Sequence, residues 1–131
     1  MARAGSTTKY PWGDEIDSSK AKYDSLFTKD GSEESTVPVG SYSANAFGVY
    51  DTAGNVEEWV EDCWHGTYKD APIDGSAWLS ASGGDCEKRV LRGGSWYSPP
   101  YGGLRSAHRN RDPVTARASF SGFRVARTLS Q

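Results

Sequence analysis

The sequence predicts an α+β domain that is irregular and loop-rich, with short antiparallel strands and few helices. Only 36% of the 131 residues are hydrophobic, yet five Trp, seven Tyr and four Phe are present, so aromatic rings must supply much of the core. In addition, 15 Gly and six Pro, many of them in turn dipeptides, divide the chain into short segments. A chain of this length is expected to form one domain around a single core.

The first part of the chain, residues 1–40, is polar and rich in turn-forming residues. The stretch "PWGDE" is typical of a tight turn, and "FTKDGSEESTVPVG" contains Gly, Ser, Thr and Pro at the frequency of a loop. We therefore predict ordered loop here, without regular secondary structure.

A short helix is predicted after the turn "DTAG" at residues 51–54. Asn55 is a suitable N-cap, and Val56, Trp59 and Val60 follow the i, i+3, i+4 spacing of an apolar helix face. The polar side of the helix would carry the acids Glu57, Glu58, Glu61 and Asp62.

Three strands are predicted in the second half of the chain, after a loop-like stretch at residues 66–88. They are "RVLRGGSW" at residues 89–96, which Gly93 and Gly94 interrupt, "LRSAHRNR" at 104–111 and "GFRVART" at 122–128. We place Trp59, Trp96 and Phe123 in the core.

The charge of the chain is divided unevenly. Residues 1–87 hold 16 of the 17 acids and six of the 15 bases, which gives −10, whereas residues 88–131 hold nine bases and one acid, which gives +8. Because most of these bases are Arg, whose planar guanidinium pairs well with carboxylates, we expect pairing within the chain, including Arg92 and Arg124. A basic segment can also bind nucleic acid, but internal pairing makes a nucleic-acid partner the weaker hypothesis.

Cys63 and Cys86 are too few for a disulfide scaffold. They are either joined in one disulfide or free and buried, and the sequence favours neither alternative.

No segment has the apolar length needed to span a membrane, and the first residues lack the apolar stretch of a signal peptide. We therefore expect a soluble chain whose compartment is unknown.

Five motifs together resemble the C-terminal half of the formylglycine-generating, or sulfatase-modifying factor, domain. They are "YPWGDE", "NAFGVYDTAGNVEEWVED", "RVLRGGSW", "LRSAHRNR" and "GFRVART", and their order and separations are similar to those of the family. The resemblance implies a variant of the C-type-lectin-like fold. It also implies that residues 1–131 form a single domain of this type that lacks the family's N-terminal half. Either the chain is a fragment, or the fold is completed in another way, for example by a partner subunit or by self-association that supplies the missing core face.

The same resemblance bears on copper. Oxidase members of the family bind copper through two cysteines just after the "GGSW" motif, and the matching stretch here, "YSPPY" at residues 97–101, contains no thiol. Oxidation at a copper thiolate needs soft sulfur ligands, which Ser and Tyr do not replace. We therefore expect no copper and favour a protein that is not an enzyme.

Calcium is the one cofactor that the resemblance suggests. The segment "GNVEEW" is similar to a place where family members bind a structural calcium ion. The Asn55 side chain, the Val56 carbonyl and the Glu58 carboxylate would contribute oxygen ligands of the kind that calcium requires. The alternative is that Asn55 is a plain N-cap.

Other catalytic and metal sites have little support in the sequence. His65 and His108 are far apart and have no metal-ligand spacing, so a zinc or iron site is not expected. Ser95 lacks the G-x-S-x-G frame of a nucleophilic serine, so a turn is the simpler interpretation.

Residues 97–121 have the composition of a binding surface. Tyr occurs here together with Ser, Gly and Asn, as in antibody loops. In such loops Tyr gives contact area at a low entropy cost, while the small residues adapt to the ligand. The predicted ligand-binding residues are Tyr97, Ser98, Tyr101, His108, Asn110, Arg111 and Phe120.

One branch of the family comprises the variable proteins of diversity-generating retroelements. Their template asparagine codons, when randomised at adenines, never give Lys, Glu, Gln, Met or Trp, and none of these five occurs at residues 97–127. Our leading hypothesis is therefore a non-catalytic module that presents a variable-type surface to a protein or glycan. The alternative is a partial or degenerate member of the sulfatase-modifying enzyme family that acts with another chain.

Overall fold

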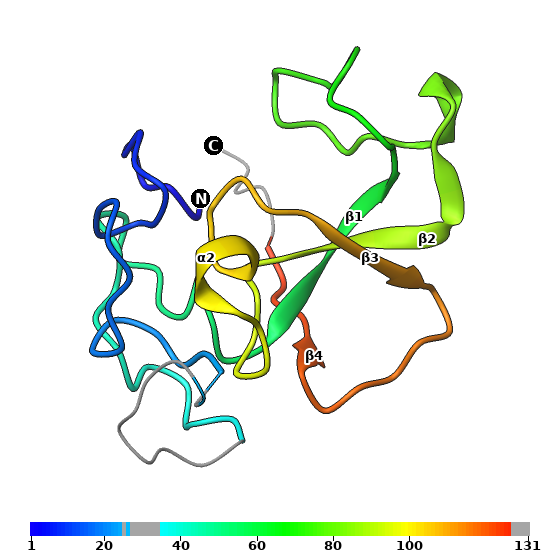
Figure 1. Ribbon diagram of the computed structural model, residues 1–131. Coiled ribbons are helices and arrows are strands. Elements are labelled where there is room, and N and C mark those ends of the chain that lie inside the picture. Colours follow the sequence, from blue (N-terminus) through cyan, green and yellow to red (C-terminus); the bar gives the residue numbers. More distant parts are fainter. Residues whose placement is uncertain (25, 27–34, 127–131) are drawn as a thin grey trace.

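The computed structural model describes residues 1–24, 26 and 35–126 and contains one four-stranded sheet (Figure 1). Most of the described chain is loop, which confirms the predicted α+β class with few helices. No helix in this part of the chain is long and apolar enough to cross a membrane. The assigned elements are β1 (Glu57–Trp64), η1 (Ser80–Ser82), β2 (Asp85–Arg92), α2 (Pro100–Gly103), β3 (Asn110–Pro113) and β4 (Ser121–Gly122).

The sheet has the strand order β3-β2-β1-β4. β2 pairs antiparallel with both β1 and β3, whereas β4 pairs parallel with β1, so the sheet is mixed and not purely antiparallel as predicted. Side chains alternate between the two faces of a strand, and paired residues share a face. One face, which we call the Trp59 face, therefore carries Glu57, Trp59 and Asn110, and the opposite Glu58 face carries Glu58, Arg92 and Arg111.

The predicted helix after Asn55 is wrong, because this segment forms β1. Asn55 lies in the left-handed region with φ 64° and its side-chain amide bonds to the backbone of Val37, so it caps no helix. The apolar spacing of Val56, Trp59 and Val60 fits a helix, but pairing with β2 at both ends of β1 overrides this local preference.

The other strand predictions are partly right. "RVLRGGSW" contains the second half of β2, which begins four residues earlier than predicted, at Asp85, and ends before Gly93. "LRSAHRNR" reaches β3 only at its last two residues, because a turn closed by the His108 amide and the Arg105 carbonyl precedes the strand. In "GFRVART" only Gly122 belongs to β4, and its last two residues lie outside the described part of the chain.

The core has two parts. Val90 and Leu91 are fully buried within β2, and a second cluster joins the N-terminal loops to the segment after α2 through Tyr10, Ala21, Tyr23, Ala53 and Leu104. Trp59 and Trp96, predicted to lie in the core, are only partly buried, and the predicted core position of Phe123 is wrong, since 75% of this residue is exposed. Tyrosine thus supplies much of the core, in agreement with the aromatic composition.

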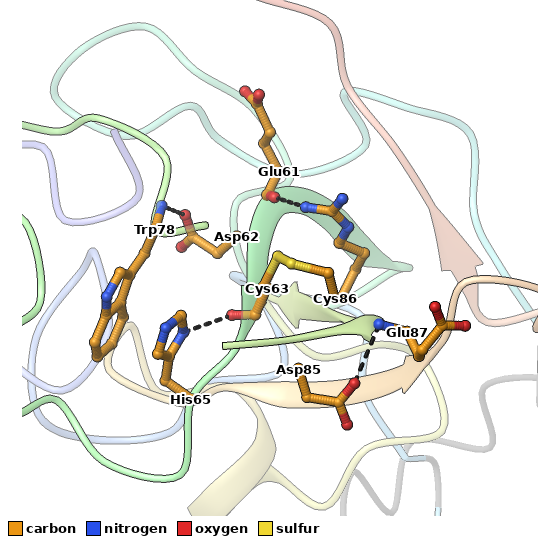
Figure 2. Close-up of a disulfide and its surroundings, with 9 residues drawn as sticks. Glu61, Asp62, Cys63, His65, Trp78, Asp85, Cys86 and Glu87 are labelled. Atoms are coloured by element: carbon orange, nitrogen blue, oxygen red, sulfur yellow. Dashed lines mark hydrogen bonds between the residues drawn. A yellow bond between two sulfur atoms is a disulfide. The ribbon is translucent and has the colours of Figure 1, made fainter. Parts of the chain in front are cut away.

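A disulfide between Cys63 and Cys86 joins β1 to β2 (Figure 2), which decides between the two alternatives left open by the sequence. The two Cα atoms are 4.5 Å apart, within the usual range for a disulfide, and the bond lies where the register of β1 and β2 shifts. Beside the disulfide, the His65 ring stacks on Trp78 with 3.7 Å between centroids, and Nδ1 of His65 lies 3.0 Å from the Cys63 carbonyl oxygen. The Trp78 amide donates to the Asp62 carboxylate, which fixes the end of the intervening loop.

The expected pairing of Arg with carboxylates holds for Arg124 but is wrong for Arg92. Arg124 donates through Nε to both carboxylate oxygens of Glu58, at 2.8 and 2.7 Å, and so ties the segment after β4 to β1. Arg92 donates instead to the carbonyl oxygen of His108, at 2.6 Å. Among the described residues, no other Arg forms an ion pair, so direct contacts neutralise little of the basic segment.

Candidate ligand-binding face

A tight turn after β2 projects Tyr97 into solvent. The Ser98 hydroxyl accepts a hydrogen bond from the Ser95 amide at 2.9 Å, and the Ser95 hydroxyl accepts one from the Tyr97 amide at 3.2 Å. Both serines are buried, so their hydroxyls satisfy turn amides that would otherwise be unpaired. Tyr97 remains 62% exposed at the tip.

Tyr97 stacks on Phe120, which comes from the loop just before β4. The ring centroids are 6.0 Å apart and the planes differ by 19°, while Trp96 meets Tyr97 edge-on at 5.6 Å. An aromatic pair of this kind contributes about 0.5–1.5 kcal/mol beyond its area burial. Two loops distant in sequence are therefore joined into one aromatic surface.

Beneath this surface lies a buried acid, Glu57, at the start of β1. Its amide donates to the Phe120 carbonyl oxygen at 2.8 Å, and its carboxylate accepts from Nδ2 of Asn110 at 3.0 Å. Burial raises the pKa of Glu57; the Asn110 hydrogen bond opposes this, and the nearby charge of Asp112 adds to it. Glu57 thus links Phe120, through its backbone amide, to Asn110, through a carboxyl group whose pKa is raised.

A pH-dependent effect follows for Glu57→Gln. Because the pKa of Glu57 is raised by folding, the folded state holds its proton more tightly, and stability falls as pH rises above the ordinary value of 4.5. Each pKa unit corresponds to about 1.4 kcal/mol. We expect Glu57→Gln to be more stable than the original chain at pH 7 and to lose this pH dependence, as measured by urea unfolding between pH 4 and pH 8.

Glu61→Gln is the matched control for that experiment, because it removes an exposed acid from the same strand. A Glu57→Gln variant that is less stable than the original chain at pH 7 would contradict the proposed burial cost.

Of the other four predicted ligand-binding residues, one lies in the turn that carries Tyr97 and three lie elsewhere. Ser98 is inside the turn, and Tyr101 is 70% exposed on α2. His108 precedes β3, and its pKa is lowered by burial and then by the charges of Arg105 and Arg92. Arg111 is on the Glu58 face of β3, with its guanidinium over the ring of Trp64. The structure therefore brings together Tyr97, Asn110 and Phe120, and separates them from Arg111.

Sequence reasoning missed Glu57 as a member of this face. In the predicted helix it was one of four interchangeable acids, and no local signal distinguishes it. A hollow on the same Trp59 face was also unforeseen, because Phe123 was assigned to the core. This hollow is lined by Trp59, Arg89, Val114, Arg117 and Phe123, among others.

The residues suggested for calcium already have protein partners. Oδ1 of Asn55 accepts a hydrogen bond from the Val37 amide at 3.0 Å, and the Glu58 carboxylate is engaged by Arg124. In this arrangement they do not fit a calcium ion, which would have to displace both Val37 and Arg124. The described residues contain no group of three or more His, Cys, Asp or Glu side chains that could hold a metal ion.

Known proteins are similar to this chain in sequence. "Serine/threonine-protein kinase pkn1" of Chlamydia caviae is 43% identical over 131 residues, which cover 97% of this chain and 19% of the kinase. The formylglycine-generating enzyme of Streptomyces coelicolor is 34% identical over 121 residues, which cover 85% of this chain and 35% of the enzyme. The chain therefore spans only a minor part of these relatives.

Two solved structures are similar to this chain in fold. PvdO from Pseudomonas aeruginosa matches with a TM-score of 0.78 and 40% identity, over 93% of this chain and 46% of PvdO. Treponema denticola variable protein 1 matches with a TM-score of 0.68 and 28% identity, over 93% of this chain and 41% of that protein.

The motif order, the sheet and the loop-rich frame all agree with the family that the sequence resembles. The family model of the sulfatase-modifying factor enzyme 1-like domain matches residues 1–129. The chain therefore belongs to the sulfatase-modifying factor enzyme 1-like domain family.

Proposed function

We propose that the chain is a non-catalytic ligand-binding module whose contact face is centred on Tyr97, Asn110 and Phe120. The observation that carries this proposal is the aromatic stack of Tyr97 and Phe120, which the Glu57 amide joins to the hydrogen-bonded pair of Asn110 and Glu57. An aromatic anchor beside a satisfied polar group is the arrangement that dominates binding energy at protein interfaces. The expected ligand is a protein or a glycan.

The position of the face supports a surface of the variable type. Tyr97 and Phe120 both lie in loops, where substitutions cost little because the buried parts of β1 and β2 hold the frame. Treponema denticola variable protein 1 is among the structural neighbours, and the five residue types that randomised asparagine codons never give are absent from residues 97–127. Tyr101 extends the face, whereas Ser98 shapes it; His108 and Arg111 belong to its periphery in this proposal.

The test replaces Tyr97 and Phe120 with Ala, singly and together, and measures binding to an array of glycans and immobilised peptides. We expect each change to weaken binding by at least tenfold, as loss of an aromatic anchor does. Because Tyr97 is 62% exposed, the Tyr97 substitution should change the free energy of unfolding by no more than about 0.5 kcal/mol.

Tyr50→Ala is the matched control, because Tyr50 is 51% exposed on a different loop. Retention of all array signals by the Tyr97 and Phe120 variants would contradict the assignment, and so would an equal loss in the control.

An enzymatic role in cooperation with another chain is the second candidate, favoured by the identity to the formylglycine-generating enzyme of Streptomyces coelicolor. Residues 97–101 contain no thiol, and Cys63 and Cys86 are joined to each other. Soft thiolate ligands for copper would thus require reduction of the disulfide. This requirement is our reason for preferring the binding module.

Partners and calcium remain predictions. Two apolar residues just after β4 are highly exposed, Phe123 at 75% and Val125 at 87%. This exposure supports self-association, or burial of the two side chains by another segment. Calcium at Asn55, Val56 and Glu58 rests on the resemblance alone and requires rearrangement of the Arg124 contact.

A further inference from the structure

Two arginines of the β3 region, Arg109 and Arg111, share the ring of one tryptophan. Their guanidinium carbons lie 4.9 and 4.5 Å from the centroid of Trp64, and that of Arg109 also lies 4.0 Å from the Tyr68 ring. Cation–π contacts hold a guanidinium by its face, so its N–H groups remain available at the edge. Aromatic contacts therefore orient both guanidiniums without using their hydrogen-bonding capacity.

These donors are not consumed by protein acceptors. In the described part of the chain, neither Arg109 nor Arg111 has a side-chain hydrogen bond or an ion pair. Arg117, by contrast, donates to the carbonyl oxygen of Ala116 at 2.7 Å. Two like charges held against one indole repel each other, and an anion between them would relieve this repulsion.

The surroundings add further positive charge. Arg92 contacts the Tyr68 hydroxyl at 3.3 Å, and its charge, together with that of Arg105, helps to lower the pKa of His108. The acid of β3 itself, Asp112, lies on the opposite Trp59 face and acts electrostatically on Glu57. On the Glu58 face, Glu58 and Asp85 are already paired with Arg124 and Lys88. The Glu58 face of β3 therefore has an excess of cations beside the two arginines.

The backbone beside these arginines has a free edge. β3 is the outermost strand of the sheet, and no strand among the described residues pairs with its outer side. Asn110 and Arg111 are exposed there. An extended peptide can add to such an edge through main-chain hydrogen bonds, while alternate side chains of the peptide reach one face of the sheet.

We propose that the edge of β3 binds an extended acidic peptide, whose alternate carboxylates pair with the guanidiniums of Arg109 and Arg111. Arg109 and Arg111 are two residues apart, so their guanidiniums lie on one face of the sheet. Every second side chain of a peptide strand paired with β3 would lie on that same face. Carboxylates at these peptide positions could form two hydrogen bonds with each guanidinium. This surface borders the Tyr97 face, because Asn110 of β3 belongs to that face. The guanidinium of Arg111 lies on the opposite side of the sheet, so the proposal does not depend on the function proposed for the Tyr97 face. The alternative is that the arginines only protect an exposed edge from aggregation.

The experiment measures fluorescence anisotropy of a labelled peptide of alternating Glu and Thr, with a Gln-Thr peptide of equal length for comparison. We expect the acidic peptide alone to bind, with an affinity that falls as salt rises. Arg109→Gln and Arg111→Gln should each weaken binding about tenfold, as the loss of one charge-assisted hydrogen-bonded pair does. Arg109→Lys and Arg111→Lys should also weaken it, because lysine keeps the charge but lacks the planar fork.

Arg117→Gln is the matched control, since it removes the same charge from a side chain that makes no cation–π contact among the described residues, and Tyr97→Ala reports on the other face. Both should bind the acidic peptide normally. The proposal fails if the acidic peptide does not bind, if the Gln-Thr peptide binds equally well, or if Arg117→Gln weakens binding as much as Arg111→Gln. Displacement of the peptide by an equal concentration of inorganic phosphate would also overturn it, in favour of a site for single oxyanions.

Discussion

Replacing both Cys63 and Cys86 with serine is expected to lower the free energy of unfolding by about 3 kcal/mol. The disulfide closes a loop between β1 and β2 with a sequence separation of 23. Its removal raises the conformational entropy of the unfolded chain, which lowers the stability of the folded state. Cys63 is fully buried, so the serine hydroxyl also loses its solvation. Urea unfolding of the original chain and of the double variant measures the difference.

A second measurement separates the cross-link from the substitution. Unfolding the original chain in the presence of a reducing agent should lower its stability by a similar amount, while the same agent should leave the double variant unchanged. Equal stability of the oxidised and reduced original chain would contradict this expectation, and would mean that the contacts of β1 with β2 hold the loop by themselves.

The success of the sequence in predicting β2 has a simple cause. Val90 and Leu91 form a short apolar piece, and Gly93 and Gly94 follow it with φ values of 92° and 68° that other residues rarely adopt. The signal for a strand and the signal for its end are therefore both local. Family resemblance then places this strand within the fold, as the match over residues 1–129 confirms.

The helix predicted where β1 forms is wrong because the signal that decides this segment is not local. This acid-rich segment has Val56, Trp59 and Val60 at helical spacing. It forms a strand because it pairs with β2, where Glu58 lies opposite Arg92. A partner more than 30 residues away is not encoded in the local pattern. Without that pairing, the burial of Glu57 could not be anticipated either.

The candidate site was predicted in part, for the same reason. Composition identifies Tyr97, Asn110 and Phe120, because aromatic and small polar residues mark a binding loop wherever it folds. Composition does not decide which neighbours share a face. Asn110 and Arg111 are adjacent in sequence, yet alternation along β3 sends them to opposite sides of the sheet.

Gly54→Ala is expected to cost about 3 kcal/mol of stability, a large effect for a single methyl group. Gly54 has φ 77°, where a side chain is strained by about 1 kcal/mol or more. A Cβ at this position would also lie 2.2 Å from the carbonyl oxygen of Lys22, a backbone atom that cannot rotate away. That same oxygen accepts the Asn55 amide at 2.8 Å, so its movement would break the link between the N-terminal loops and the start of β1.

Gly75→Ala separates the two contributions. Gly75 has φ 83°, but a Cβ there would meet no atom within 4 Å, so this variant carries the conformational strain without the collision. We expect Gly75→Ala to cost about 1 kcal/mol, and the remaining difference from Gly54→Ala to measure the contact with Lys22. Equal costs for the two variants in urea unfolding would show that the N-terminal loops yield to the methyl group. In that case the packing of Ala21 and Tyr23 beside Lys22 is softer than their burial indicates.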